Sequence, residues 1–311
     1  MIARPHRLVL LGSVIADLLI RVPALPERGG DVVGTADPIQ AGGGFNVLAA
    51  ASRLGMPTAL LGLVGQGPLG TVLAAALAET GTALLLPRAT GDTGLCVVLV
   101  EPDGERTFVT TTGVEAGLTA DLLDDVHPAA GDVVYVSGYD LAYAGSGPVL
   151  ADWIGRVAPR VVFDPGPLVT DIPPRLLDTV LAHTGILTLN ARELSLLSGG
   201  ADPEVALTAV TTRVPTAAVI ARAGADGCRV AVAGRSQLVP APRVTPVDST
   251  GAGDAHTGAL LAALSAGHDL FEAARRGNAA AAYAVTRAGS ATAPGPDELA
   301  SMLPGLSGPT S

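Results

Sequence analysis

Residues 247–264 read VDSTGAGDAHTGALLAAL, in which a polar, glycine-containing turn leads directly into an apolar, alanine-rich helix. Gly251 and Gly253 allow the backbone to fold tightly and allow a ligand to approach it closely. Ser249 or Thr250 is a suitable residue to cap the start of this helix. The free N–H groups of the turn and the positive end of the helix dipole would then face one point, which predicts a binding site for an anion such as a phosphate.

A carboxylate lies within this predicted anion site. Asp254 places a negative charge where a phosphate would bind, which is unfavourable unless the carboxylate has a chemical role. A suitable role is to accept a proton from a hydroxyl group as that hydroxyl attacks a phosphoryl group. The alternative is an ordinary helix start, because the dipole favours an acidic residue in the first turn. The residues of this stretch leave both interpretations open.

Residues 248–254, DSTGAGD, resemble the C-terminal signature of the ribokinase/PfkB family of carbohydrate kinases, D-T-x-G-A-G-D. The resemblance implies that Asp254 is the general base. It also implies that the backbone N–H groups of Gly251, Ala252 and Gly253 stabilise the charge that develops on the transferred phosphoryl group.

The resemblance implies an α/β, ribokinase-like fold, with a mostly parallel central sheet flanked by helices and a small β-strand lid. From residue 131 onward the chain alternates between apolar strand-like runs and helical stretches, which independently indicates a mostly parallel sheet. We expect a single kinase domain over residues 1–303, with lid strands at about 14–40 and 93–111. Residues 304–311 are expected to form a frayed tail.

A second motif lies near the N-terminus, where residues 42–55 combine glycines, an asparagine and an alanine-rich helix that ends in Leu-Gly. This pattern is similar to the N-terminal signature of the same family. The resemblance implies that Gly42, Gly43 and Asn46 bind the sugar hydroxyls. Asp17, after the first predicted strand, would join them, since a site built around such hydrogen bonds rejects ligands that lack the hydroxyls. The alternative is a flexible turn in which Asn46 caps the helix.

Asn190 and Glu193 stand three residues apart after another predicted strand, on one face of a helix. As a purely structural feature they would form a capping box. The family has an N-x-x-E motif here, which implies that both residues organise Mg²⁺, Glu193 through water, and that Asn190 also contacts ATP. An amide and a carboxylate suit a hard cation that keeps most of its waters.

Further ATP contacts are implied by the resemblance for residues of the strands and helices around the signature. Arg222 stands where the family commonly has threonine, and it either reaches the ATP phosphates or is exposed. The implied contacts are Thr250, Arg222, Gly224, Gly227 and Asn278.

The resemblance also implies a monovalent-cation site, for example for K⁺, near Asp248 and the loop at 285–291. A homodimer formed through the lid is expected as well, because exposed strand edges attract partners. A sugar acid as substrate would require a cation in the pocket, and Arg28, Arg88 and Arg106 are the candidates without another assigned role.

Residues 65–70 fit the dinucleotide-binding pattern G-x-G-x-x-G between a predicted strand and a predicted helix. Pro68 is unusual in a loop that binds through backbone N–H groups, and the acidic residue expected about 20 positions later is missing. The family commonly has V-G-x-D-x-x-G here, so Gly67 replaces an aspartate. Gly166 also lacks the asparagine side chain that the family often has. His256 replaces the usual phenylalanine, and we expect it to have a packing role.

The composition sets outer limits. The chain has 311 residues, of which 48% are hydrophobic and 15% charged, so it can bury a large core. Its net charge of −10 argues against a nucleic-acid partner. No apolar run reaches the roughly 18–20 residues needed to cross a membrane, and the first apolar run is expected to be a strand rather than a signal peptide. We therefore expect a cytoplasmic protein.

The expected reaction is phosphoryl transfer from ATP to a hydroxymethyl group of a small sugar. A nucleoside kinase of the same family is an alternative, although a purine needs an aromatic slot and only 3% of the chain is aromatic. A non-catalytic sugar or nucleotide sensor is another alternative. The presence of Asp254, Gly251 and Gly253 argues against it.

Overall fold

The structure, a computed structural model, describes residues 4–200 and 202–303, so the predicted tail at 304–311 lies outside the described residues. Its main element is a nine-stranded sheet in the order β14-β13-β12-β11-β10-β9-β1-β5-β6. Every neighbouring pair is parallel except the two pairs that β13 makes. The strands are β1 (Arg7–Leu11), β5 (Thr58–Leu61), β6 (Ala83–Leu84), β9 (Asp132–Ser137), β10 (Val161–Asp164), β11 (Thr184–Asn190), β12 (Ala218–Arg222), β13 (Cys228–Val232) and β14 (Arg235–Val239).

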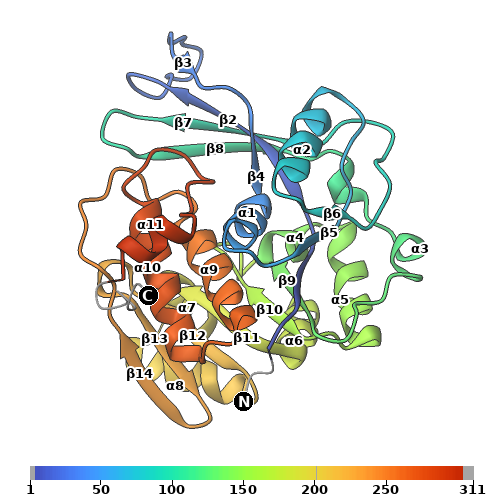
Figure 1. The fold of residues 1–311 in the computed structure, drawn as a ribbon. Coiled ribbons are helices and arrows are strands. Elements are labelled where there is room, and N and C mark those ends of the chain that lie inside the picture. Colours follow the sequence, from blue (N-terminus) through green and yellow to red (C-terminus); the bar gives the residue numbers. More distant parts are fainter. Residues whose placement is uncertain (1–3, 201, 304–311) are drawn as a thin grey trace, which may run out of the picture.

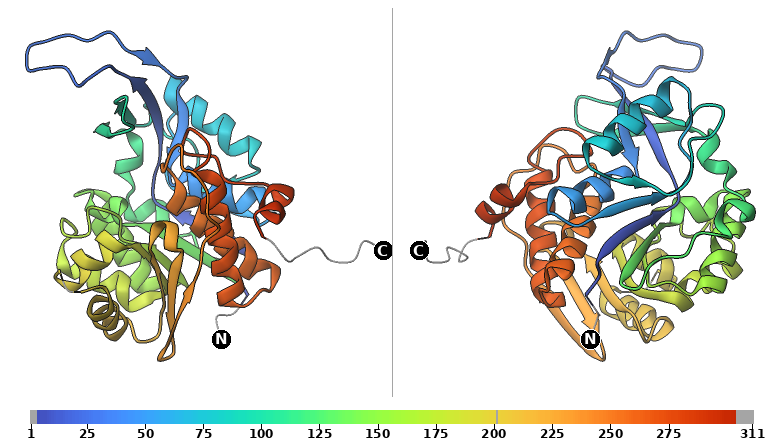
Figure 2. Two further views of the ribbon diagram at one scale, coloured as in Figure 1. Left: turned by 90° about the vertical axis from the view of Figure 1, so that its left-hand side faces the viewer. Right: turned by 45° about the vertical axis from the view of Figure 1, so that its right-hand side comes forward.

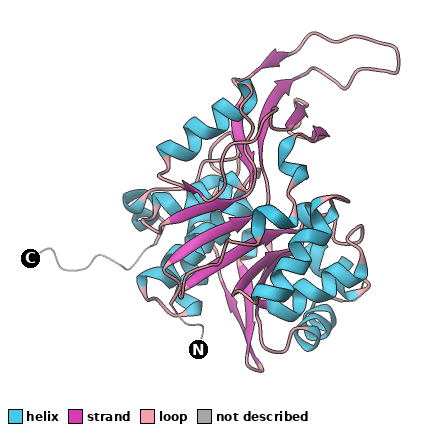
Figure 3. Ribbon diagram, turned by 90° about the vertical axis from the view of Figure 1, so that its right-hand side faces the viewer, coloured by secondary structure: helices cyan, strands magenta, loops and turns pink. Residues whose placement is uncertain are grey.

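Helices cover both faces of this sheet (Figures 1 and 3). One face carries α1 (Phe45–Arg53), α2 (Pro68–Glu79), α9 (Ala252–Ala266) and α10 (Leu270–Ala284), with α11 (Pro296–Ser301) against α10. The other face carries α3 (Ala120–Leu123), α4 (Gly138–Ala142), α5 (Ser146–Val157), α6 (Pro174–His183), α7 (Ala191–Ser198) and α8 (Pro203–Arg213). Two 3₁₀ turns lie at Val114–Gly117 and Gly224–Asp226.

Strand β1 shows why a continuous apolar run forms the centre of this sheet. Leu8 and Leu10 join the core beneath α1 and α9, whereas Val9 and Leu11 join the core beneath α5 and α6. Successive side chains of a strand point to opposite faces, so a strand buried on both sides must be apolar throughout.

A second, five-stranded sheet forms the predicted lid. Its strands are β2 (Val14–Arg21), β3 (Thr35–Ala36), β4 (Gln40–Gly43), β7 (Leu95–Val100) and β8 (Arg106–Thr111). They lie in the order β3-β2-β7-β8, with β4 also pairing with β2, and only β2 and β7 run parallel. The loop between β2 and β3 projects away from the body of the molecule (Figure 2).

The strands at one edge of the lid are shorter than expected. We expected lid strands over about residues 14–40, but after Arg21 only Thr35–Ala36 pairs, and the next pairing begins at Gln40. Strand β4 therefore includes Gly42 and Gly43, which the sequence indicated as a turn. Gly42 lies opposite Ile15 in this pairing. Its lack of a side chain leaves space for Asp17, because a Cβ at residue 42 would lie 1.9 Å from Oδ2 of Asp17.

The structure explains why Gly67 can replace an aspartate. Helix α2 begins at Pro68, and its N-terminal N–H groups are bound by Asp92, which arrives from a different loop. Oδ1 of Asp92 accepts a hydrogen bond from the N–H of Gly70 at 2.8 Å, and Oδ2 accepts one from the N–H of Leu69 at 3.2 Å. A Cβ on Gly67 would lie 2.4 Å from the Asp92 carboxyl carbon.

This arrangement also contradicts the dinucleotide alternative. The N–H groups of Leu69 and Gly70 would have to bind a pyrophosphate, yet the Asp92 carboxylate already takes both. A second anion at that helix end would face an uncompensated negative charge.

Replacing Asp92 with alanine should remove this cap and destabilise the protein by about 1 kcal/mol, the usual effect of losing a helix cap. The melting temperature measures the effect. Asp103→Ala is the matched control, because Asp103 accepts a backbone hydrogen bond only within an exposed turn. Equal melting temperatures for the two variants would contradict the capping role.

Candidate active site

A cavity of about 470 Å³ opens where the carboxyl ends of the central strands meet the lid and the start of α9. The ends of four neighbouring strands supply Ser137 from β9, Asp164 from β10, Asn190 from β11 and Arg222 from β12. Asp164 lies opposite Ser137 and Asn190 opposite Arg222 in the strand register. Ligands of open α/β sheets collect at this edge.

The cavity brings together most of the residues that the sequence indicated. Those that line it are Asp17, Gly43, Asn46, Asn190, Glu193, Arg222, Thr250, Gly251, Gly253 and Asp254. The remaining candidates do not line it, and these are Gly42, Ala252, Gly224, Gly227, Asp248 and Asn278.

The glycine turn before α9 has the geometry of an anion site, but its cap differs from our expectation. The N-cap is Gly251, with φ of 71°, rather than Ser249 or Thr250. A side chain at residue 251 is excluded because its Cβ would lie 2.1 Å from the Ser290 carbonyl oxygen. The N–H of Ala252 donates to the Ser249 carbonyl at 3.3 Å, which leaves the N–H groups of Gly251 and Gly253 for a ligand.

Asp254 lies beside this turn and faces the cavity. Nδ2 of Asn46, on α1, donates to its Oδ2 at 3.2 Å. Burial, together with the nearby charge of Asp164, raises the pKa of Asp254 to about 7, although the Asn46 hydrogen bond acts in the opposite direction. The carboxylate can therefore exchange a proton near neutral pH, as a general base must.

Arg222 is neither exposed nor free. Its Nη1 donates to Oδ2 of Asp164 at 3.0 Å and to the Gly253 carbonyl at 3.4 Å, and its Nη2 donates to Oε2 of Glu193 at 3.4 Å. Burial raises the pKa of Glu193 and the charge of Asp164 raises it further, whereas Arg222 lowers it. One guanidinium thus lies between two carboxylates at the foot of the anion turn.

Asn190 and Glu193 form the capping box that the sequence indicated. Oδ1 of Asn190 accepts from the Glu193 N–H at 2.9 Å, and Oε2 of Glu193 accepts from the Asn190 N–H at 2.7 Å. The structural role is confirmed, and it places the same two side chains in the cavity wall. Capping and ligand binding are therefore compatible.

The donor set near Glu193 also fits Mg²⁺. Two carboxylates, Asp164 and Glu193, share one arginine, so a negative charge is left over. In residues 4–200 and 202–303, no three His, Cys, Asp or Glu side chains gather as a metal cage. Mg²⁺ usually keeps several waters and binds through one or two carboxylates and substrate phosphates.

The other end of the cavity holds two further carboxyl groups, one of which the sequence analysis missed. Burial raises the pKa of Asp17 to about 6 and that of Asp140 to about 7. Oδ1 of Asp140 accepts from the Ser13 N–H at 2.8 Å. Gly12 makes room for it, because a Cβ there would lie 2.2 Å from Oδ2 of Asp140. The only signal in the sequence that could have indicated Asp140 was its position, three residues after the predicted strand that ends at Ser137.

Aromatic side chains are concentrated around the cavity. Phe108, Tyr135, Tyr139 and Tyr143 line it, although the whole chain has only nine Phe, Tyr and Trp residues. Our argument from the low aromatic content against a nucleoside is therefore wrong, because a local concentration decides whether a ring can be bound. Phe108 and Tyr139 are exposed at the mouth of the cavity.

Several sequence candidates have other surroundings. Asn278 is buried and its Nδ2 donates to the Val239 carbonyl at 2.8 Å, so it joins α10 to the end of β14. Gly224 is exposed, and Gly227 makes the tight turn into β13, with φ of 96°. Burial lowers the pKa of His256 to about 3, and this neutral ring packs against Gly277, as expected for a packing residue.

The predicted monovalent-cation site is occupied by a side chain. Nη2 of Arg106 donates to Oδ1 of Asp248, and the N–H groups of Thr250 and Gly289 donate to the same carboxylate. A K⁺ ion beside Asp248 would meet the guanidinium, so these residues do not fit the ion. Arg88 is also accounted for, because it donates to the Gly65 carbonyl.

The chain is similar to known proteins in sequence and in fold. The model of the pfkB family carbohydrate kinases matches residues 5–297. The chain belongs to this family. The kinase is 33% identical over 300 residues to the uncharacterized sugar kinase YegV of Escherichia coli K12, which covers 94% of this chain and 92% of that protein. It is 30% identical over 295 residues to the ribokinase of Haemophilus influenzae, covering 91% and 93% of the two chains.

Solved structures show the same fold. The kinase resembles the ribokinase of Thermotoga maritima with a TM-score of 0.84 and 23% identity, over 95% of this chain and 98% of that one. It resembles the Arabidopsis thaliana ribokinase complexed with ribose and ATP with a TM-score of 0.78 and 26% identity, over 97% and 99%. The kinase therefore has a ribokinase fold, and as a member of the carbohydrate kinase family it is a phosphotransferase. None of its described helices could span a membrane, and the cytoplasmic location stays a prediction.

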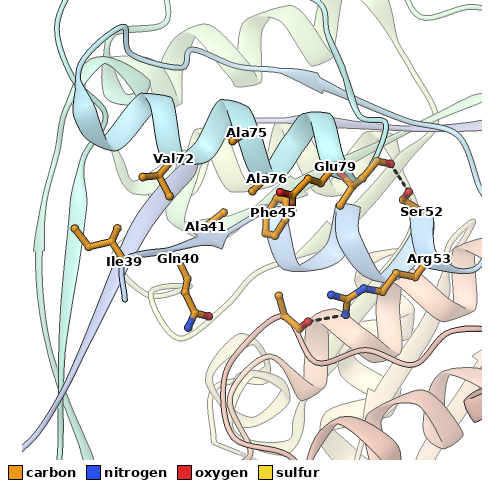
Figure 4. A pocket seen from close by; sticks show the side chains of 12 residues that line it. Ile39, Gln40, Ala41, Phe45, Ser52, Arg53, Val72, Ala75, Ala76 and Glu79 are labelled. Atoms are coloured by element: carbon orange, nitrogen blue, oxygen red, sulfur yellow. Dashed lines mark hydrogen bonds between the residues drawn. The ribbon is translucent and has the colours of Figure 1, made fainter. Parts of the chain in front are cut away.

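A larger hollow of about 810 Å³ lies between α1 and α2, away from these groups (Figure 4). Its polar side chains are mostly occupied: Ser52 donates to the Thr80 carbonyl and Arg53 to the Ala291 carbonyl. Because it lacks converging polar groups, this hollow offers no chemistry that a kinase requires.

The Asp140→Asn variant should gain stability over the unaltered kinase as the pH rises from about 5 to about 8, in the absence of ligand. The raised pKa means that the native state holds the Asp140 proton more tightly than the unfolded chain, and this stabilisation is lost as the pH rises through about 7. Asparagine mimics the protonated acid at every pH. The free energy of unfolding of the variant should therefore exceed that of the unaltered kinase by an amount that grows with pH, on the order of 2–4 kcal/mol.

Urea unfolding at both pH values measures the difference. Asp121→Asn, at an exposed position, is the control and should show no such trend. A constant stability difference between Asp140→Asn and the unaltered kinase would contradict the raised pKa.

Proposed function

We propose that this kinase transfers the γ-phosphoryl group of ATP to a hydroxymethyl group of a small, uncharged sugar, with Asp254 as the general base. The observation that supports this best is the contact of Asp254 with both halves of the site. It adjoins the Gly251–Gly253 turn on one side, and Asn46 donates a hydrogen bond to it on the other.

In this mechanism the acceptor hydroxyl gives its proton to Asp254 while its oxygen attacks the γ-phosphorus. The bond from that phosphorus to the bridging oxygen breaks, and ADP leaves. The N–H groups of Gly251 and Gly253 stabilise the charge on the transferred group, and the Arg222 guanidinium lies next to Gly253 to do the same.

The residues suited to hold Mg²⁺ are Glu193 and Asp164, through water, with Asn190 beside them. When bound, the ion would neutralise charge on the ATP phosphates. Arg222 keeps the two carboxylates in place without ligand, since leaving either buried charge unpaired is unfavourable.

The acceptor end favours a neutral substrate. Asp17 and Asp140 can each accept hydrogen bonds from sugar hydroxyls, and the two arginines with known partners lie elsewhere, because Arg106 binds Asp248 and Arg88 binds Gly65. Arg222 also lines the cavity, but it is already paired with Asp164 and Glu193. A sugar acid or sugar phosphate would bring its negative charge beside Asp17 and Asp140 without an unpaired cation, so we expect the kinase to reject it.

A nucleoside is the second candidate substrate, supported by the aromatic residues Phe108, Tyr139 and Tyr143 around the cavity. A solved structure with 26% identity is an aminoimidazole riboside kinase of Salmonella enterica in complex with its riboside. Exposed aromatic faces can stack on a base as well as on the apolar face of a sugar.

The homodimer through the lid also stays a prediction.

Asp254→Asn should reduce kcat by about 10²–10⁴ while largely preserving ATP affinity, because it removes only the proton acceptor. In the unaltered kinase, kcat should rise with pH through about 7, where the Asp254 carboxyl loses its proton. Stopped turnover assays across pH measure both effects. A variant that turns over at the normal rate would exclude Asp254 as the base.

ADP release over a panel of neutral sugars, sugar acids, sugar phosphates and nucleosides should identify one neutral class. Asp17→Asn should then raise the KM of that acceptor with little change in the KM of ATP, because Asp17 lies at the acceptor end. Turnover of nucleosides alone would favour the second candidate. ATP binding without turnover of any compound would favour a sensor, and turnover of sugar acids alone would contradict the charge argument.

A further inference from the structure

Arg106 links the lid to the core next to the anion turn. It is the first residue of β8, and its Nη2 donates to Oδ1 of Asp248 at 2.5 Å, across 142 positions of the sequence. Both side chains are largely shielded from water, with exposed fractions of 17% for Arg106 and 8% for Asp248. An ion pair of this kind is screened by salt much less than one on the surface.

Asp248 organises the backbone beneath the anion turn. Its Oδ1 accepts from the Thr250 N–H at 2.7 Å and its Oδ2 accepts from the Gly289 N–H at 3.0 Å. These bonds join the segment before Gly251 to the loop that contains Ser290, whose carbonyl excludes a side chain at residue 251. The position of the turn therefore depends on an ionised Asp248.

This carboxylate requires a positive partner. It lies three residues before Gly251 and six before Asp254, behind the part of the cavity lining where the proposed function places the ATP phosphates. An uncompensated negative charge there would repel the nucleotide and would be unfavourable to bury. The structure supplies the positive charge from the lid, at the position where the family resemblance implied a monovalent ion.

We propose that Arg106 is a built-in cation at Asp248, which positions the anion turn and makes this kinase independent of monovalent cations. The inference rests on the proposed function for its catalytic consequence only. Arg106 is a positioning residue, since it acts through Asp248 and does not line the cavity. Phe108 and Thr110 lie on the same face of β8 as Arg106, and both line the cavity. The strand therefore contacts the site through Arg106 at its start and through Phe108 and Thr110 further along.

The experiment compares the unaltered kinase with Arg106→Ala in K⁺ and in tetramethylammonium, at a constant ionic strength of about 0.1 M. The unaltered kinase should show the same kcat and ATP KM in both. Arg106→Ala should lose about tenfold or more in kcat/KM for ATP in tetramethylammonium, and K⁺ should restore much of it, because the vacated carboxylate can then bind the ion.

Arg106→Lys and Arg21→Ala are the matched variants. Only one nitrogen of Arg106 binds Asp248, and its Nε has no partner. A lysine can supply one donor and one charge, so Arg106→Lys should stay independent of K⁺. Arg21 is another lid arginine in an ion pair, with Asp37 at 3.0 Å on the exposed side. Arg21→Ala should resemble the unaltered kinase.

ATP titration calorimetry and the melting temperature with increasing K⁺ give readouts that do not need turnover. K⁺-specific gains in ATP affinity and melting temperature for Arg106→Ala alone would support the proposal even if no acceptor were turned over, an outcome that would count only against the proposed function. A requirement for K⁺ in the unaltered kinase would overturn it. So would an Arg106→Ala variant that responds to K⁺ no more than Arg21→Ala does.

Discussion

The close packing of α1 against α9 is the constraint on which the site depends. Gly258 makes it possible, because a Cβ there would lie 2.5 Å from the Ala50 side chain and 2.8 Å from the Val47 carbonyl. The two helices begin beside the two glycine-containing segments that line the cavity, so their contact sets the distance between these segments. The Asn46 amide thereby reaches the Asp254 carboxylate at 3.2 Å. Both helices are rich in alanine, and these small side chains permit the close contact. Larger side chains would move Asn46 away from Asp254.

The second constraint is electrostatic, because the cavity gathers several carboxyl groups in little space. Burial raises the pKa of Asp140 and Asp254 to about 7, and Arg222 lies between Asp164 and Glu193. Such groups destabilise the ligand-free protein, and they are typical of sites whose ligands complete the charge balance. In the proposed function, sugar hydroxyls would donate to one end of the cavity, and a magnesium nucleotide would bring cations to the other. The proposed ligands and the site are thus complementary in charge.

The sequence predicted the parts that depend on local pattern. The alternating apolar runs gave the parallel sheet, and the spacing of Asn190 and Glu193 gave the capping box. The failures concern contacts between distant segments. Asp92 caps α2 from another loop, and Asp140 enters the cavity because Gly12 leaves space, and no periodicity records either contact. Composition misled us on the aromatic residues, because four of them gather at one cavity. The cap at Gly251 is decided by the Ser290 carbonyl, which is also distant in sequence.

Strand β8 connects the cavity to the segment beneath the anion turn. Side chains of a strand alternate between faces, so Arg106, Phe108 and Thr110 point the same way. Phe108 and Thr110 line the cavity, while Arg106 binds Asp248 beneath the anion turn. A shift of the hairpin by one residue would turn all three away together. If the proposed acceptor contacts Phe108, it would hold β8 in register and would thereby favour the ion pair at Asp248. In the proposed reaction, this strand would couple acceptor binding to the order of the anion turn, which would favour transfer to the acceptor over transfer to water.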